Sequence, residues 1–210
     1  MRLSIEEVGL RYGKVDVLTG FSARFEDHTL TALTGPSGSG KTTLLAAMAG
    51  YLQPSSGTIR LYSDEGQPSP PTPALVAWVP QGSNALSGRT ALDNVLLGAL
   101  SSGRTMTDAV AVATAALERV GVAHRAGAAA KTLSGGELQR VAFARALASD
   151  KPIIFADEPT ANLDADSTDQ LAHVLEALRS TRLLVVATHD PILIEAAQTA
   201  VSLRLEHHGH

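Results

Sequence analysis

The sequence predicts an α/β fold with a core of mainly parallel sheet, an N-terminal antiparallel β subdomain and an inserted helical subdomain. Two observations lead to this prediction. Short apolar runs bounded by turn residues indicate strands, and these runs are closely spaced at first and later alternate with helical stretches. Close spacing favours antiparallel pairing, whereas alternation with helices is typical of buried parallel strands. Residues 1–210 are therefore expected to form a single domain.

The predicted strands begin near the N-terminus and recur to the end of the chain. They occupy residues 2–8, 17–25, 30–35, 58–63, 75–80, 152–157, 182–188 and 200–205. The stretch 64–74 contains four prolines and is expected to be a surface loop that joins two strands.

A helical insertion is predicted where the strand signal stops, between Gln81 and Leu133. Apolar side chains recur at helical spacing along residues 107–120. The residues expected on the inner face of this helix are Val110, Ala113, Leu117 and Val120. We expect the helical subdomain to span roughly 83–149 and to interrupt the α/β core.

Composition narrows the classes of protein that fit this chain. It is 44% hydrophobic and 18% charged, as globular proteins are, and its formal net charge of -4 gives no reason to expect a nucleic-acid partner. The absence of cysteine excludes disulfides, thiolate metal sites and a cysteine nucleophile. No window reaches the roughly 18 apolar residues of a membrane span. We therefore expect a soluble, cytoplasmic protein whose membrane role, if any, depends on a partner chain.

The stretch GPSGSGKTT, residues 35–43, has the pattern of a phosphate-binding loop. It follows a predicted strand and opens a predicted helix, which is the context that such a loop needs. Gly35, Gly38 and Gly40 would let the backbone wrap a triphosphate, while Lys41 would reach the β and γ phosphates and Thr42 would ligate Mg²⁺. The alternative is a glycine-rich turn with an exposed lysine, but the strand and helix context favours the core of a P-loop NTPase.

The apolar strand in KPIIFADEPT ends in two acids, Asp157 and Glu158. Burying unpaired charge is costly, so carboxylates in this position indicate contact with cations or water. Asp157 is suited to the Mg²⁺ shell, and Glu158 to orienting or deprotonating an attacking water. In isolation the pair could equally cap a helix. The phosphate loop favours the catalytic interpretation.

Three further polar or aromatic residues follow strands but are less specific. His189 ends a core strand on the side where α/β sheets bind ligands, although a lone histidine is usually a surface or capping residue. Gln81 could contact Mg²⁺ or the water, or merely cap a loop. Tyr12 could stack on a base or be an ordinary strand aromatic. The histidines of LEHHGH, residues 205–210, are better explained by a disordered end or an expression remnant than by a metal site.

A second candidate phosphate site lies in LSGGELQR, residues 133–140. Gly135 and Gly136 precede a predicted helix, and a helix N-terminus with bare backbone N–H groups attracts anions. The chain already has a phosphate loop, so the pattern raises the question of whose phosphate this second site contacts.

The phosphate loop, LSGGELQR, ADEPTANLD and THD, in this order, resemble the nucleotide-binding subunits of ATP-binding cassette (ABC) transporters. The match extends over nearly the whole chain, and the LSGGE stretch is highly specific to this class. The resemblance implies an ATP hydrolase with ATP and Mg²⁺ as ligands. It also implies a location on the cytoplasmic face of the cell membrane, held there by an integral membrane permease.

The resemblance assigns a role to each candidate residue. Tyr12 would stack on adenine, Gln81 would be the Q-loop residue and a Mg²⁺ contact, and Asp164 would be the D-loop aspartate. Asp157 would be the Walker B carboxylate, Glu158 the catalytic glutamate and His189 the switch histidine. The Walker A residues would be Gly35, Ser37, Gly38, Ser39, Gly40, Lys41, Thr42 and Thr43.

In ABC ATPases two domains dock head to tail around two ATP molecules, which answers the question of the second site. Ser134, Gly135 and Gly136 would close over the γ-phosphate that the other copy's Lys41 holds. Loss of that phosphate would let the dimer open, and a permease held near Gln81 and the helical subdomain would respond to the motion.

The transported substrate is less well indicated. GPSGSGKTTLL, the compact length, and Asn162 ahead of Leu163 and Asp164 resemble the ATPases of lipoprotein-releasing, macrolide-exporting and haem-exporting systems. This favours export of a hydrophobic or amphipathic substrate. An importer ATPase and a cell-division-type signalling ATPase that moves no substrate stay open. Chromosome-maintenance and translation-factor ATPases are disfavoured, because they carry long coiled coils or two fused cassettes.

Overall fold

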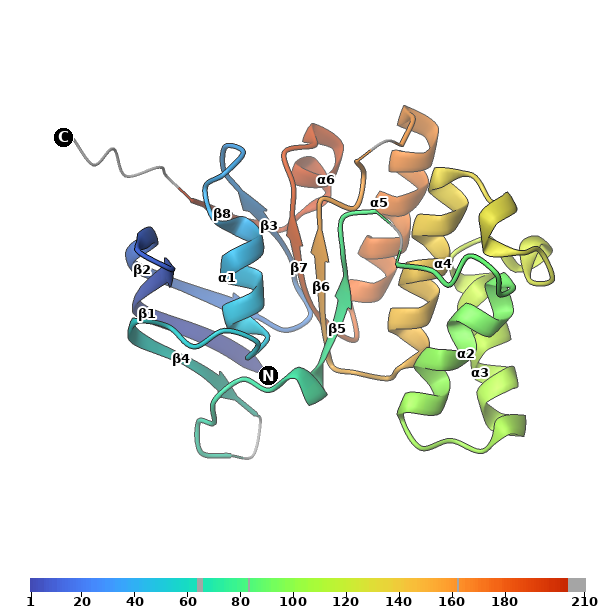
Figure 1. The fold of residues 1–210 in the computed structure, drawn as a ribbon, viewed down its shortest axis with the longest axis horizontal. Coiled ribbons are helices and arrows are strands. Elements are labelled where there is room, and N and C mark those ends of the chain that lie inside the picture. The colour runs from blue at the N-terminus through green and yellow to red at the C-terminus, as the bar shows by residue number, and fades with distance from the viewer. Residues whose placement is uncertain (64–65, 83, 162, 204–210) are drawn as a thin grey trace.

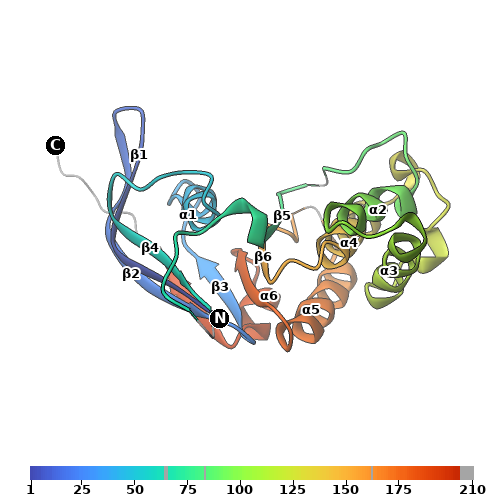
Figure 2. The same cartoon turned by 90° about the horizontal axis from the view of Figure 1, so that it is seen from below.

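The computed structural model describes residues 1–63, 66–82, 84–161 and 163–203, which form two sheets and a group of helices beside them (Figure 1). The smaller sheet is antiparallel, with β1 (Arg2–Tyr12) between β2 (Val15–Glu26) and β4 (Ser56–Tyr62). β1 and β2 form a long hairpin that extends beyond the rest of this sheet (Figure 2).

The larger sheet is parallel and has the strand order β5-β6-β7-β3-β8. Its strands are β3 (Leu30–Thr34), β5 (Val76–Val79), β6 (Ile153–Asp157), β7 (Leu183–Ala187) and β8 (Thr199–Ser202). Every residue of β6 and β7 is buried, which explains why their sequences are continuous apolar runs. Although β3 follows closely on the antiparallel hairpin, it pairs in parallel with β7 and β8.

Helix α1 (Lys41–Met48) joins the two sheets into one core. Its side chains Leu44, Leu45 and Met48 are completely buried in a cluster that also contains Leu3 of β1 and Phe155 of β6. This packing fixes the position of the loop that precedes α1, because α1 cannot shift without opening the cluster.

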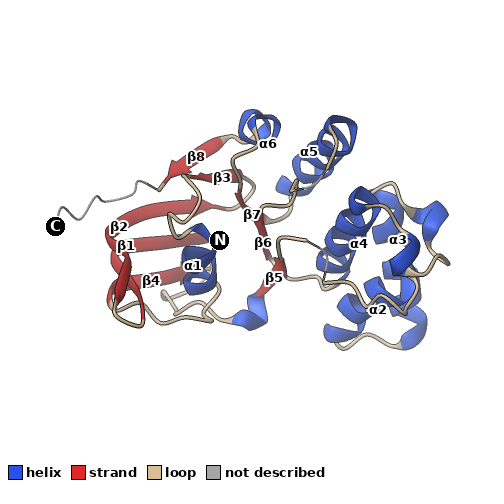
Figure 3. Cartoon of the chain, turned by 45° about the horizontal axis from the view of Figure 1, so that its top comes forward, coloured by secondary structure: helices blue, strands red, loops and turns tan. Residues whose placement is uncertain are grey.

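The other helices lie to the side of the parallel sheet away from β1, β2 and β4 (Figure 3). Helices α2 (Ala91–Ser101), α3 (Met106–Arg119) and α4 (Gly135–Ala148) come between β5 and β6 in the chain. Helix α5 (Ala165–Arg179) follows β6, and α6 (Pro191–Ala196) follows β7. Three single 3₁₀ turns, Pro73–Leu75, Ala123–Arg125 and Ala130–Thr132, complete the described elements.

The expected inner face of α3 was wrong at one position. Ala113, Leu117 and Val120 are buried, but Val110 is 38% exposed. Ala109 and Ala116 are buried in its place. The face of α3 that packs on α2 and α4 is rotated toward the alanines, because small side chains let neighbouring helices approach closely. The apolar pattern of the sequence instead favoured the larger Val110 as a buried residue.

Several sequence expectations fall partly or wholly outside the described residues. These are residues 64–65 of the proline-rich stretch, Asn162, and the tail LEHHGH. The described part of the proline-rich stretch lies along β4, where Ser69 and Leu61 exchange two backbone hydrogen bonds. Among the helices that the structure describes, none has the length and apolar character needed to cross a membrane.

Candidate functional site

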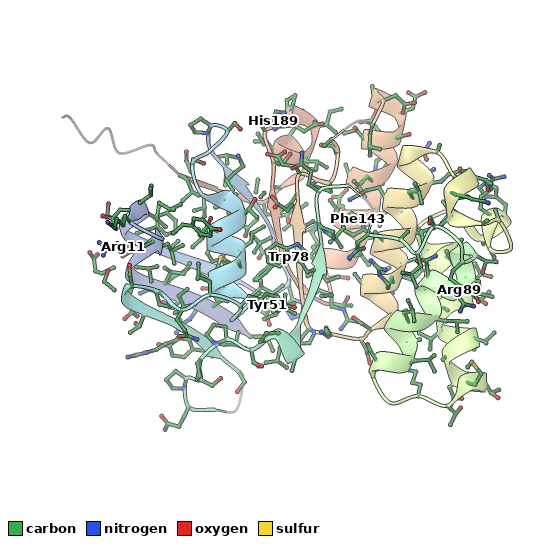
Figure 4. All side chains as sticks on the ribbon, in the orientation of Figure 1. Arg11, Tyr51, Trp78, Arg89, Phe143 and His189 are labelled. Carbon is green, nitrogen blue, oxygen red and sulfur yellow. The ribbon has the colours of Figure 1, made fainter. Side chains whose placement is uncertain are left out.

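A cavity of about 800 Å³ lies where the C-terminal ends of β3, β6 and β7 meet the hairpin of β1 and β2. Figure 4 shows His189 at this end of the parallel sheet, just beyond β7. Most of the predicted site residues line the cavity, although they come from distant parts of the chain. The lining residues are Tyr12, Val15, Val17, Gly35, Pro36, Ser37, Gly38, Gly40, Lys41, Thr42, Thr43, Gln81, Asp157, Glu158 and His189.

The glycine-rich loop between β3 and α1 forms the floor of the cavity. Gly38 and Gly40 have left-handed backbones, with φ of 80° and 90°. A Cβ atom on Gly40 would lie 2.6 Å from the Val17 Cγ1 atom, so a larger residue would collide with β2. Among the described residues no side chain caps the start of α1, which leaves its first N–H groups available to an anion in the cavity.

Lys41 folds back over this loop and is largely buried. Its Nζ donates hydrogen bonds to the carbonyl oxygens of Gly35 at 3.0 Å and Pro36 at 3.3 Å. The same atom lies 3.5 Å from Glu158 Oε1. The ammonium group therefore stands between the loop and the acids that end β6.

Asp157 is the last residue of β6 and is buried. Its Oδ2 accepts a hydrogen bond of 2.6 Å from the Thr42 hydroxyl. Burial raises the pKa of the Asp157 carboxyl, and the neighbouring Glu158 carboxylate adds to this effect, whereas the Thr42 hydrogen bond and Lys41 oppose it. A buried carboxylate beside a hydroxyl, with a positive charge nearby, is an arrangement that a cation would stabilise.

Glu158 has an unusual backbone conformation, with φ of 43°. Its N–H donates to the Ala187 carbonyl at 2.8 Å, which continues the pairing of β6 with β7 past the end of the strand. The Oε2 atom of Glu158 lies 2.9 Å from the Nδ1 atom of His189. A left-handed backbone at a glutamate is costly, and such strain is concentrated at functional sites. Here it directs the carboxylate toward both Lys41 and His189.

The opposite end of the cavity is apolar. Tyr12 ends β1 with 80% of its surface exposed, and Val15 and Val17 of β2 lie beside it in the cavity wall. The two valines were not anticipated from the sequence. Their spacing of two residues places them on one face of a strand, and this pattern could have suggested a shared surface.

Some predicted residues do not line the cavity. Ser39 is buried below the loop, where its hydroxyl finds no hydrogen-bond partner within the described residues. Asp164 caps α5, since its Oδ1 accepts from the Ser167 amide at 2.8 Å.

Ser134, Gly135 and Gly136 also lie outside the described lining of the cavity. The Ser134 Oγ accepts from the Glu137 amide at 3.2 Å, and Glu137 Oε2 accepts from the Ser134 amide at 2.8 Å, which makes a capping box at the start of α4. Ser134 and Gly135 are exposed. This second turn is therefore exposed and separate from the described lining of the chain's own cavity.

The model of the ABC transporter family matches residues 18–161. Among curated proteins, the lipoprotein-releasing system ATP-binding protein LolD of Geobacter metallireducens is 39% identical over 84% of this chain and 82% of its own length. LolD of Shewanella oneidensis is 42% identical over 77% of this chain and 74% of its own length.

Solved structures have the same fold. The dimeric structure of a bacterial ABC transporter cassette aligns with a TM-score of 0.82 and 26% identity, covering 96% of this chain and 94% of that one. The cbiO1 protein of Clostridium perfringens, part of the cbiONQ ABC transporter complex, aligns with a TM-score of 0.86 and 26% identity, and the alignment covers 96% of this chain and 85% of that one. These matches confirm the predicted α/β fold with its P-loop NTPase core and identify the chain as an ATP hydrolase. The chain belongs to the ATP-binding subunits of the ABC transporter family.

Proposed function

We propose that this chain binds Mg²⁺ and ATP in the cavity, hydrolyses the ATP with Glu158, and dimerises head to tail to drive a separate membrane permease. The observation that carries the proposal is the convergence of Lys41, Asp157, Glu158 and His189 on one cavity whose other end is apolar. Residues 1–210 would act as one ABC ATPase domain with a helical subdomain at roughly 83–149.

The proposed phosphate contacts come from the loop and its lysine. The Walker A residues Gly35 to Thr43 would surround the triphosphate, with Lys41 as the point charge on the β and γ phosphates. Nucleotide would have to compete with Glu158 and the two loop carbonyls that hold Lys41 now.

The residues present fit a Mg²⁺ ion. A hydroxyl and a carboxylate, Thr42 and Asp157, lie in contact at the cavity, and Gln81 adds an amide to its lining. Oxygen ligands of this kind are those that Mg²⁺ takes in phosphate sites. When bound, Mg²⁺ would neutralise charge on the β and γ phosphates.

Glu158 and His189 would act on the attacking water. Glu158 would accept a proton from a water in front of the γ-phosphate, and its hydrogen-bonding contact with His189 would help to orient the carboxylate. His189 is exposed, so it can contact a group that arrives with a second copy.

The second copy would contribute Ser134, Gly135, Gly136 and Asp164. The exposed turn at the start of α4 would offer a hydroxyl and bare amides to a γ-phosphate, and it is not part of the described lining of the chain's own cavity. The dimeric cassette among the structural relatives supports a dimer. The head-to-tail arrangement is part of our proposal.

We propose export or extraction of a hydrophobic or amphipathic substrate of the lipoprotein, haem or drug type. The two LolD relatives, both named as lipoprotein-releasing, support this direction. The alternative is an importer ATPase. Several transport systems use this fold, since the structural relatives include a putative metal-chelate type ABC transporter and an Atm1-family ABC exporter. A signalling ATPase of the cell-division type is the third possibility. In each case the chain would lie on the cytoplasmic face of the membrane, held there by the permease.

Co-expression with a cognate permease is expected to raise ATP hydrolysis, because the permease would hold two copies close enough to share their nucleotides. Hydrolysis would be measured for the chain alone and with permeases of the lipoprotein-releasing, drug-exporting and importing kinds. The Lys41→Ala chain provides the control, since it should bind the same permease without stimulation. Stimulation by an importer permease alone would contradict export, and failure of every permease would contradict a transport role.

Replacing Tyr12 by Ala is expected to weaken ATP binding about 5- to 150-fold, because stacking on a nucleobase contributes roughly 1 to 3 kcal/mol. Tyr12→Phe should be mild, since the ring is kept. Isothermal titration with ATP measures both. Tyr51→Ala is a matched control, because Tyr51 is also an exposed tyrosine and lies outside the cavity lining. Equal affinity of Tyr12→Ala and the parent would make Tyr12 an ordinary strand residue.

A further inference from the structure

The first turns of α4 and α5 are packed closely against each other. Gly136 is buried, and a Cβ atom on it would lie 2.8 Å from Ser167 Oγ and 3.2 Å from Ser167 Cβ. A side chain at position 136 would therefore require Ser167 to shift. Figure 1 shows α4 and α5 side by side. The position of the turn at 134–136 therefore depends on what occupies position 167.

Ser167 also contacts the segment that leads away from the nucleotide cavity. Its amide donates to Asp164 Oδ1 at 2.8 Å, and hydrogen bonding from the Ser167 side chain and amide lowers the pKa of Asp164. Asp164 follows Glu158 in the chain by six residues. One small side chain thus stands between the turn at 134–136 and the segment that begins at the catalytic glutamate.

A second contact joins the two helices. Arg140, one turn further along α4, donates through Nη1 to Gln170 Oε1 on α5. With the helices joined at this point, added bulk at Ser167 acts first on the nearest segment, the first turn of α4, where Ser134 and Gly135 are exposed.

We propose that Ser167 is a positioning residue that sets the place of the turn at 134–136 and so governs hydrolysis of the nucleotide held by the other copy. This inference rests on the head-to-tail dimer of the proposed function. Ser167 touches no nucleotide in this arrangement. Its effect passes through Gly136, and the chain's own cavity, which Ser167 does not line, keeps its affinity.

The first test varies the size of residue 167. Ser167→Val adds bulk against Gly136, and a displacement on the order of 1 Å should slow hydrolysis about 10²-fold. Ser167→Ala is the matched control for size, because it adds no atom against Gly136 and keeps the residue 167 amide that donates to Asp164, so it should lose far less hydrolysis than Ser167→Val. ATP affinity of the dilute monomer should be the same in all three chains. Parental hydrolysis by Ser167→Val, or weaker ATP binding by its monomer, would overturn the inference.

A size exchange tests whether the contact itself is responsible. Gly136→Ala alone should slow hydrolysis, because its methyl group meets Ser167 Oγ. Adding Ser167→Gly removes the atoms that the methyl group meets and should restore much of the lost rate. Circular dichroism checks that each chain is folded. A double variant no faster than Gly136→Ala would overturn the inference.

Mixing experiments identify which site is affected. In a head-to-tail dimer of Ser167→Val with Lys41→Ala, one site has both changes and the other has neither, so ATP-dependent heterodimers should form and hydrolyse ATP faster than either variant alone. Ser134→Arg mixed with Lys41→Ala is the reference pair, since it depends only on the head-to-tail arrangement. Heterodimers in the reference pair but not with Ser167→Val would overturn the role of Ser167. Their absence in the reference pair would contradict the proposed dimer.

Discussion

The Glu158→Gln chain is expected to bind ATP and hydrolyse it about 10²- to 10⁴-fold more slowly than the parent, the usual contribution of a general base. The amide keeps the shape of the side chain but removes the charge that accepts a proton from water. It also weakens the attraction between residue 158 and Lys41, whose Nζ lies 3.5 Å from Glu158 Oε1. ATP should therefore stay intact in the cavity and the dimer should accumulate.

The rate of ATP hydrolysis and the molecular mass of the protein, both measured with ATP and Mg²⁺ present, test the slower hydrolysis and the accumulation of the dimer. The parent should be mainly monomeric without nucleotide, while Glu158→Gln should have the mass of a dimer once ATP is added. Glu176→Gln removes the same charge from the exposed side of α5 and serves as the control. Hydrolysis by Glu158→Gln at the parental rate would remove Glu158 from the mechanism.

Much of the fold could be predicted from the sequence because local pattern and final structure agree. The apolar runs at 153–157 and 183–187 are buried on both faces, so tertiary packing reinforces what their composition favours. The phosphate loop was predictable for the same reason, since its glycines have the left-handed backbones that a glycine adopts easily. Position along the chain alone was enough to place Asp157, Glu158 and His189 at the same edge of the parallel sheet.

The features that could not be predicted depend on contacts between distant residues. Val110 fits the apolar spacing of α3, but the packing of small alanines against α2 and α4 leaves it exposed. The contact of Lys41 with Glu158 joins residues more than a hundred positions apart. The glycine at 136 suggested an anion site, whereas its closest constraint in the structure is a helix packing contact with Ser167. Spacing along the chain carries no information on such pairs.

The Ser134→Arg chain is expected to bind ATP like the parent and to hydrolyse it about 10²- to 10³-fold more slowly, as enzymes do when a donor to developing charge is lost. A long cation would occupy the exposed turn where the other copy's γ-phosphate must approach a hydroxyl and bare amides. The chain's own cavity is untouched, because Ser134 does not line it. Nucleotide titration of the dilute monomer and a turnover assay separate binding from hydrolysis.

Lys41→Ala changes the other half of the same composite site. Its ATP affinity should fall, because the β and γ phosphates lose the positive charge of Lys41. The substitution also removes the hydrogen bonds that the lysine Nζ donates to two loop carbonyls and its contact with Glu158. Each variant alone should hydrolyse ATP poorly for a different reason. One keeps its nucleotide but cannot complete the other copy's site, and the other completes a site but holds no nucleotide.

Mixing the two variants distinguishes a composite site from a self-contained one. In a head-to-tail heterodimer one site has both changes and the other has neither, so the mixture should form ATP-dependent dimers and recover part of the activity that both variants lack. If a single intact site cannot turn over, the dimer mass will still rise with ATP while hydrolysis does not. A dilute Ser134→Arg monomer that fails to bind ATP would give the opposite answer, because the turn at 134–136 would then contact the chain's own nucleotide and no second copy would be needed to complete the site.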